Sequence, residues 1–127
     1  MEDTLASLMQ TYAVFIERVK DIHRLGALQG HLGWDQETIM PSKGSDARSD
    51  ILSWLAGERH ERLIDPEMGR MLDSLEQEKE LDEDQQANVR EMRRTYDKAI
   101  KLPSEFVAAF AKAKSEALLS WQKARQN

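Results

Sequence analysis

The fold of this chain is decided by residues 5–32, which read LASLMQTYAVFIERVKDIHRLGALQGHL. Apolar side chains recur there at steps of three and four residues, and charged side chains such as Glu17, Arg18 and Asp21 lie mostly between them. One apolar stripe at this spacing is typical of an amphipathic α-helix. The stretch therefore predicts a long first helix over residues 4–38, which must end near Met40-Pro41 because proline disfavours the α conformation in the residue before it.

Three glycines, Gly26, Gly30 and Gly33, lie in the last third of this helix. Each costs about 1 kcal/mol of helix stability relative to alanine. Their spacing of four and three residues places them near one another on the helix surface. They either let another backbone approach closely or mark a point where the helix frays, and the sequence leaves both interpretations open.

Start and stop signals divide the rest of the chain into four further helices. Asp65-Pro66-Glu67 combines an N-cap acid, a proline at the first helical position and an acid in the first turn. Asp82-x-x-Gln85 resembles a capping box, and Pro103 opens the last helix. We expect these helices at residues 46–64, 66–80, 83–101 and 103–125.

The last predicted helix carries an apolar stripe made of Phe106, Val107, Phe110, Ala113, Ala117, Leu118 and Trp121. The fold class is therefore all-α, with about five helices in an elongated bundle. A length of 127 residues suits a single helical region spanning 1–127.

Composition excludes several classes of protein. The chain has no cysteine, which rules out disulfides, a thiol nucleophile and cysteine-based zinc sites within it. Its acidic start lacks the apolar region of a signal peptide, and no apolar run approaches the roughly 20 residues of a membrane span. We expect a cytoplasmic protein that does not enter a membrane.

Charge is distributed unevenly along the sequence. Residues 1–84 carry a net charge of −10 and residues 85–127 a net charge of +5. A basic segment can bind nucleic acid, but these basic residues are spread along helices with a single aromatic residue, Tyr96, among the first five. We expect no nucleic-acid partner, and expect the basic end to pair with acidic residues of this chain or of a partner domain.

The three histidines do not form a metal site. His60-Glu61 begins the His-Glu-x-x-His pattern of zinc peptidases, but Ile64 stands where the second histidine is required. His23 and His31 lie about 12 Å apart along one helix, too far to share an ion. The sequence therefore predicts neither a catalytic residue nor a metal ligand, and no cofactor bound by this chain.

One segment, residues 32–41, differs from ordinary helix surface. It reads LGWDQETIMP and joins a large aromatic residue, Trp34, to polar residues that can bind a helix end: Asp35, Gln36 and Thr38. Met40 and Pro41 close it. Either these groups stabilise the corner, with Trp34 and Met40 as anchors, or the indole and carboxylate line a groove for peptides.

The same residues resemble the N-terminal signature of the carboxypeptidase Taq family. Gly44 and Arg48 continue the match, and further elements agree in order and spacing: Leu55-Ala56, His60-Glu61, Asp65-Pro66, Arg94-x-Tyr96-Asp97, Lys101-Leu102-Pro103 and Trp121-x-x-Ala124-Arg125. The similarity runs from about Tyr12 onward. We therefore expect Trp34, Asp35, Gln36, Thr38, Met40, Pro41 and Arg48 to serve as structural or groove-lining residues.

The resemblance implies a fold and a function. Members of this family are helical cytoplasmic metallocarboxypeptidases, usually homodimers, which remove single residues from peptide C-termini. A His-Glu-x-x-His helix and a downstream glutamate hold zinc or cobalt, and the N-terminal helices form a wall or lid of the substrate groove. The present sequence lacks that helix, so the resemblance implies an N-terminal fragment that is inactive alone and whose partner is the remainder of the parent peptidase.

A second hypothesis assigns the chain to a different class of protein. It would be a stand-alone helical interaction or dimerisation module, because the apolar stripe through Phe106, Phe110 and Trp121 would need a partner to cover it. The two hypotheses differ in whether peptide hydrolysis belongs to the complete gene product.

Overall fold

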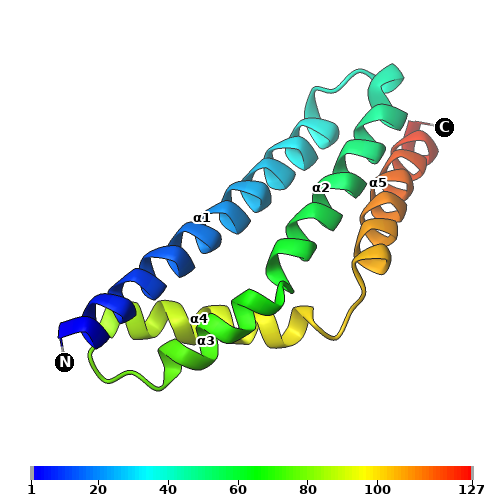
Figure 1. The fold of residues 1–127 in the computed structure, drawn as a ribbon. Helices are drawn as coiled ribbons and strands as arrows, with labels where there is room; N and C mark the ends of the chain where they lie inside the picture. The colour runs from blue at the N-terminus through cyan, green and yellow to red at the C-terminus, as the bar shows by residue number, and fades with distance from the viewer. Residues whose placement is uncertain (1, 127) are drawn as a thin grey trace. The chain divides into compact units, whose positions relative to one another are not determined.

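The structure, a computed structural model, describes residues 2–126, with side chains from Leu5 to Gln126. Its elements are α1 (Glu2–Thr38), the 3-10 turn η1 (Ser42–Gly44), α2 (Ser45–Leu63), α3 (Pro66–Glu76), α4 (Glu83–Ala99) and α5 (Ser104–Gln126) (Figure 1). No strand occurs in the part of the chain that the structure describes, which confirms the all-α fold class. No helix among these residues combines the length and the apolar character needed to cross a membrane.

The contacts divide the chain into two compact units. Unit 1 comprises the residues up to His23 together with Arg62–Lys101, and unit 2 comprises Arg24–Glu61 together with the residues from Leu102 onward. Unit 1 thus contains the first part of α1 with α3 and α4. Unit 2 contains the rest of α1 with most of α2 and with α5.

Unit 1 is built around an apolar core. Leu8, Phe15 and Ile22 of α1 are buried at intervals of seven residues, which keeps them on one helix face. They pack in one cluster with buried residues of the later segments: Leu63, Met68, Met71, Leu72, Leu75, Leu81, Val89, Met92 and Ala99. Burying one such large side chain contributes about 1.5–3 kcal/mol, so this cluster is the main source of stability in unit 1.

The starts of α3 and α4 match the sequence signals. The Asp65 carboxylate accepts a hydrogen bond from the Glu67 amide at 2.9 Å, with Pro66 at the first helical position. Asp82 and Gln85 exchange reciprocal side-chain bonds to backbone amides at 2.8 and 2.9 Å, which completes a capping box. Both predicted helix starts are therefore confirmed.

The end of α3 differs from the sequence prediction. The helix stops at Glu76, not at residue 80 as the sequence suggested. A helix that ended at residue 80 would hold Glu78 and Glu80 in its last turn, where the negative end of the macrodipole disfavours acidic side chains. Leu81 then turns into the core at 4% exposure, which an extended α3 would not allow without a change of direction.

α3 and α4 lie against each other in opposite directions (Figure 1). Arg93 of α4 bonds Asp73 and Glu76 of α3 at 2.6 and 2.7 Å. Next to this ion pair, Tyr96 of α4 lies over Gly69, where an added Cβ would be 2.5 Å from the tyrosine hydroxyl oxygen. The missing side chain of Gly69 is therefore what allows Tyr96 to pack onto α3.

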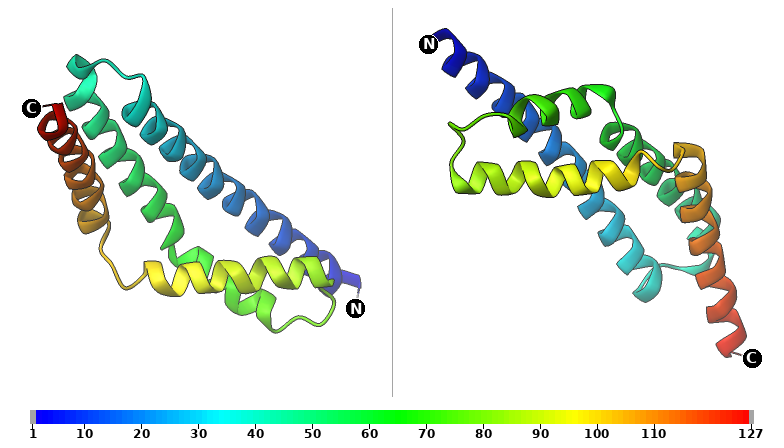
Figure 2. Two further views of the ribbon diagram at one scale, coloured as in Figure 1. Left: turned by 180° about the vertical axis from the view of Figure 1, so that it is seen from behind. Right: turned by 90° about the horizontal axis from the view of Figure 1, so that it is seen from below.

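Unit 2 is organised by close packing of α2 against α5, which run side by side in all views (Figures 1 and 2). Small residues of α2 recur every four positions, at Ser49, Ser53 and Gly57. Ser53 donates to the carbonyl of Ala108 at 2.9 Å, and a Cβ on Gly57 would lie 3.6 Å from the Ala108 side chain. Because no large side chain separates the two helices along this line, their backbones approach closely.

This packing leaves the largest side chains of the α5 apolar stripe exposed. Phe106, Phe110 and Trp121 are 53%, 56% and 56% exposed, whereas the buried residue of this helix is Ser115. The helix is rotated so that its small side chains meet α2, because bulky rings would hold the two backbones apart.

The structure also decides between the two interpretations of the glycines in α1. The helix continues through Gly26, Gly30 and Gly33 to Thr38, so the prediction that it frays there is wrong.

Replacing Asp65 tests the α3 cap. Asp65 also pairs with Arg18 of α1 at 2.9 Å within unit 1. Asp65→Ala removes both interactions, and we expect the free energy of unfolding in urea to fall by about 1 kcal/mol. Asp65→Asn keeps an acceptor for the Glu67 amide and should lose less. Equal losses in the two variants would show that the cap contributes nothing.

The pH dependence of stability provides an independent test of the interactions of Asp65. The amide of Glu67 and then the Arg18 guanidinium hold the pKa of Asp65 below its usual value. A lowered folded-state pKa means that the stabilisation is fully present above the unfolded value of about 3.9 and is lost as the pH falls through the folded value. We expect the stability difference between wild type and Asp65→Asn to be larger at pH 7 than at pH 3, measured by urea titration. An unchanged difference would contradict this.

Gly69→Ala tests the contact with Tyr96. Alanine favours a helix over glycine by about 1 kcal/mol, but overpacking costs about 1–3 kcal/mol. We expect a net fall in melting temperature, reduced when Tyr96→Phe removes the hydroxyl that meets the new Cβ. A rise in melting temperature for Gly69→Ala alone would refute the close approach.

Candidate functional site at the end of α1

The end of α1 is stabilised by its own residues. The Thr38 hydroxyl donates to the carbonyl of Trp34 at 2.7 Å, and the amides of Ile39 and Met40 donate to the carbonyl of Asp35 at 3.1 and 3.0 Å. These bonds satisfy carbonyls that the last turn of a helix leaves unpaired. Pro41 then takes an extended conformation, with φ −62° and ψ 144°, and directs the chain into η1.

Arg48 of α2 binds this end of α1 from the side. Its guanidinium lies 2.9 Å from the Asp35 carboxylate, and the same nitrogen donates to the carbonyl of Leu32 at 2.8 Å. The two charged side chains are only 17% and 25% exposed, for Arg48 and Asp35 respectively. A partly shielded pair with an added backbone bond holds α1 and α2 together more firmly than a solvated surface pair.

Gln36, also near the end of α1, contacts α5. Its amide nitrogen donates to the Ser115 hydroxyl of α5 at 2.6 Å, and Ser115 in turn bonds Ser49 of α2 at 2.7 Å. Gln36, Ser115 and Ser49 are 5%, 4% and 2% exposed. A chain of buried hydrogen bonds therefore joins all three helices of unit 2, and each polar group in it would be costly to bury without its partner.

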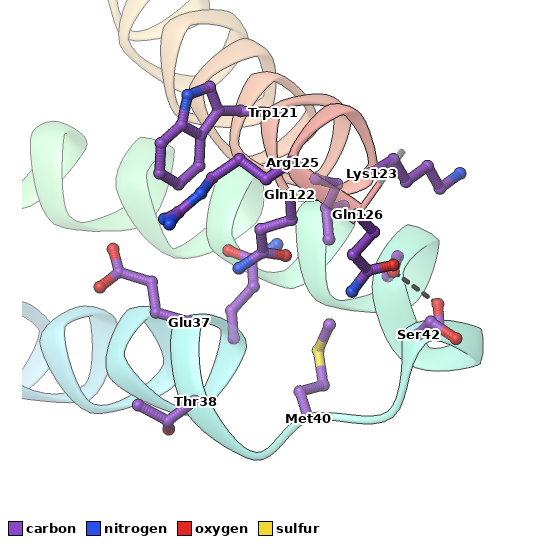
Figure 3. A pocket seen from close by; sticks show the side chains of 12 residues that line it. Glu37, Thr38, Met40, Ser42, Trp121, Gln122, Lys123, Arg125 and Gln126 are labelled. Carbon is purple, nitrogen blue, oxygen red and sulfur yellow. Dashed lines mark hydrogen bonds between the residues drawn. The ribbon is translucent and has the colours of Figure 1, made fainter.

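A cavity of about 580 Å³ opens beside this hydrogen-bond chain, between the end of α1, η1 and the last turns of α5 (Figure 3). Glu37, Thr38 and Met40 border it on one side, and Trp121 and Arg125 border it on the other. The Arg125 guanidinium lies 4.8 Å from the centre of the Trp121 ring. The cavity offers an aromatic face, cationic groups, a carboxylate, hydroxyls and side-chain amides, which can bind a polar chain such as a peptide.

The seven signature residues do not form one cluster. Gln36, Thr38 and Met40 border the cavity, whereas Asp35 and Arg48 pair beside it and Pro41 sets the turn. Trp34 stacks on His31 with ring centres 6.4 Å apart and is 56% exposed, so its side chain does not line this cavity.

Sequence reasoning missed Ser49 and Ser115, the two hydroxyls that complete the Gln36 interaction. Each is a single small polar residue on a helix, and the partners are separated by 66 and 79 residues in the chain. The available signal was the four-residue spacing of Ser49, Ser53 and Gly57, which marks a face of α2 suited to close packing.

His60 is a buried residue of unit 2 whose ring nitrogen lies 2.8 Å from the Ser104 hydroxyl at the start of α5. His23 and His31 are exposed. Within residues 2–126, no three or more His, Cys, Asp or Glu side chains are arranged to hold a metal ion. We therefore assign no step of a metal-dependent reaction to these residues.

The chain is similar to known proteins over about nine tenths of its length. A solved structure described as "The Structure of CHT" superposes with a TM-score of 0.71 and 35% identity, covering 92% of this chain and 24% of that one. Thermostable carboxypeptidase 1 of Thermus thermophilus is 32% identical over 117 residues, and its namesake from Pyrococcus furiosus is 28% identical over 116 residues. The chain is thus similar to helical carboxypeptidases.

The family follows from a match that covers nearly the whole sequence. Residues 14–127 match the Carboxypeptidase Taq (M32) metallopeptidase family, and the chain belongs to it. The two curated relatives match over 90% and 91% of this chain, which spans only 23% of the length of each of them. The resemblance expected from residues 32–41 is therefore confirmed.

A double-mutant cycle tests the buried hydrogen-bond chain. Gln36→Ala and Ser115→Ala should each lower the free energy of unfolding by about 1–3 kcal/mol, and the double variant should cost less than the sum, because the two side chains share one interaction. Gln36→Ala with Ser104→Ala is the matched control. Those residues have separate partners, so their costs should add within about 0.5 kcal/mol. Additive costs for Gln36 and Ser115 would contradict the coupling.

Proposed function

We propose that this chain is the N-terminal groove-wall or lid region of a metallocarboxypeptidase that removes C-terminal residues from peptides. The observation that carries the proposal is the family match over residues 14–127, together with the 23% share of the curated relatives that the chain spans. In this proposal the metal, zinc or cobalt, is held by the remainder of the parent enzyme. The chain contributes shape and contacts to the substrate groove.

The end of α1 is the part of the chain best suited to meet peptide. Its cavity places the Trp121 ring, the Arg125 guanidinium and the Glu37 carboxylate around one opening, which suits an extended chain with polar backbone groups. The role of Asp35 and Arg48 is then to hold α1 and α2 so that this opening keeps its shape. The remainder of the parent peptidase and a peptide substrate are the proposed partners, in a cytoplasmic homodimer.

The alternative is a stand-alone helical interaction or dimerisation module. It is supported by the large apolar side chains that unit 2 leaves exposed, among them Trp54 at 62% and Phe110 at 56%. Such residues favour association when they gather into a patch. The alternative requires no peptidase partner.

Peptide hydrolysis separates the two proposals. We expect the 127-residue chain alone to release no C-terminal residue from an N-blocked peptide, and the complete protein encoded by the native gene to release it. The activity of the complete protein should be abolished by a chelator and restored by zinc or cobalt, measured by chromatography of the released amino acid.

Two other results would overturn the proposal. Chelator-sensitive release by the purified 127-residue chain would show that it is not catalytically silent. A stop codon directly after the codon for Asn127, with no hydrolysis, would favour the interaction module, which light scattering should then detect as a defined oligomer.

A further inference from the structure

Unit 2 contains a second opening, an open groove of about 860 Å³ between α1 and α5. One wall is formed by Gly26, Gly30 and Gly33 of α1, and the other includes Leu118 and Trp121 of α5. Leu52 of α2 also lines it. Three helices therefore surround a channel that is lined largely by small and apolar groups.

The glycine wall distinguishes this groove from ordinary surface. A Cβ added at Gly26 would lie 3.1 Å from the Arg59 guanidinium, so that glycine makes room for a neighbour within the chain. A Cβ added at Gly30 or Gly33 would meet nothing within 4 Å among the described residues. Glycine weakens a helix interior relative to alanine. The two bare positions thus weaken α1 without serving any contact in the described part of the chain.

We propose that this groove seats a helix supplied by the part of a carboxypeptidase Taq chain that lies outside the present sequence. The inference rests on the proposed function, because the occupant comes from the remainder of the parent enzyme. The region that matches this chain makes up 24% of the solved relative and 23% of the curated ones, so about three quarters of such a protein remains to cover it. A helix is the fitting occupant, because the regular structure among the described residues of this family member consists of helices, without a strand.

The dimensions of the wall fit helix packing. Gly26 to Gly33 spans about 10 Å of α1, or two turns, at about 1.5 Å per residue. The glycine positions of this wall let the ridges of an incoming helix approach the α1 backbone between the side chains of Gln29 and Glu37, while Leu118 and Trp121 provide apolar contact on the other side. Two basic residues, Lys114 and Arg59, and one acidic residue, Glu37, also line the groove, so the occupant should have an apolar face flanked by charges of both signs.

Thiol protection tests the proposal in the complete protein encoded by the native gene. The variants are Gly30→Cys and Gly33→Cys in the groove, and Leu28→Cys as the matched control on the opposite face of the same helix, where the native side chain is 45% exposed. A side chain at position 30 or 33 has space within this chain, so the variants should fold, as circular dichroism will verify. Maleimide labelling rates in the native protein, each divided by the rate in denaturant and assigned by mass spectrometry, report access to each site.

We expect the thiols at positions 30 and 33 to react at least tenfold more slowly than the thiol at position 28, independently of protein dilution and of added peptide. Equal rates at 30 and 28 would overturn the proposal. Protection that disappears on dilution would assign the groove to a second copy of the chain, and protection that appears only with added peptide would assign it to substrate. Either result also overturns it.

Hydrolysis measured on the same samples separates this inference from the proposed function. An active complete protein with an accessible thiol at position 30 refutes the seated helix and leaves the peptidase proposal standing. A protected thiol in a complete protein without peptidase activity has the opposite meaning: the helix seat stands and the peptidase proposal fails.

Discussion

The close approach of α2 and α5 is the constraint on which unit 2 depends. Ser49, Ser53 and Gly57 present a face so small that the carbonyl of Ala108 comes within hydrogen-bonding distance of a side chain on the other helix. Packing at this distance leaves no room for aromatic rings between the helices. The rings of Phe106 and Phe110 therefore stack on each other at the surface, with centres 6.1 Å apart, and polar groups hold the interior.

The contacts of the family-signature residues lie in the same unit, around the helices α1, α2 and α5. Its least exposed members, Gln36 and Arg48, bind residues of other helices or turns, and neither is placed to perform chemistry by itself. Gln36 reaches α5 through Ser115, while Arg48 binds the last turns of α1. Specific hydrogen bonds of this kind fix the register of packed helices. Several residues of the motif thus make structural interactions beside a cavity that others of them line.

Local signals made much of the fold predictable from sequence. The caps at Asp65 and Asp82 depend on residues two or three positions away, so they could be read directly. The orientation of α5 could not, because an apolar stripe indicates which face is hydrophobic and not which neighbour will cover it. The same limit applies to the candidate site, where the residues around the corner were recognised but the partner of Gln36, 79 residues away, was not.

The two units satisfy their apolar side chains in different ways, and this difference bears on function. Unit 1 gathers most of its large apolar side chains into one buried cluster. Unit 2 buries Leu55 and Ala56 besides its small and polar residues, and leaves Trp54, Phe106 and Trp121 more than half exposed together with a groove bordered by three glycines. Surfaces of this kind are stable in a soluble protein when another element covers them. Unit 2 is therefore the part of the chain that offers exposed apolar surface for another element to cover.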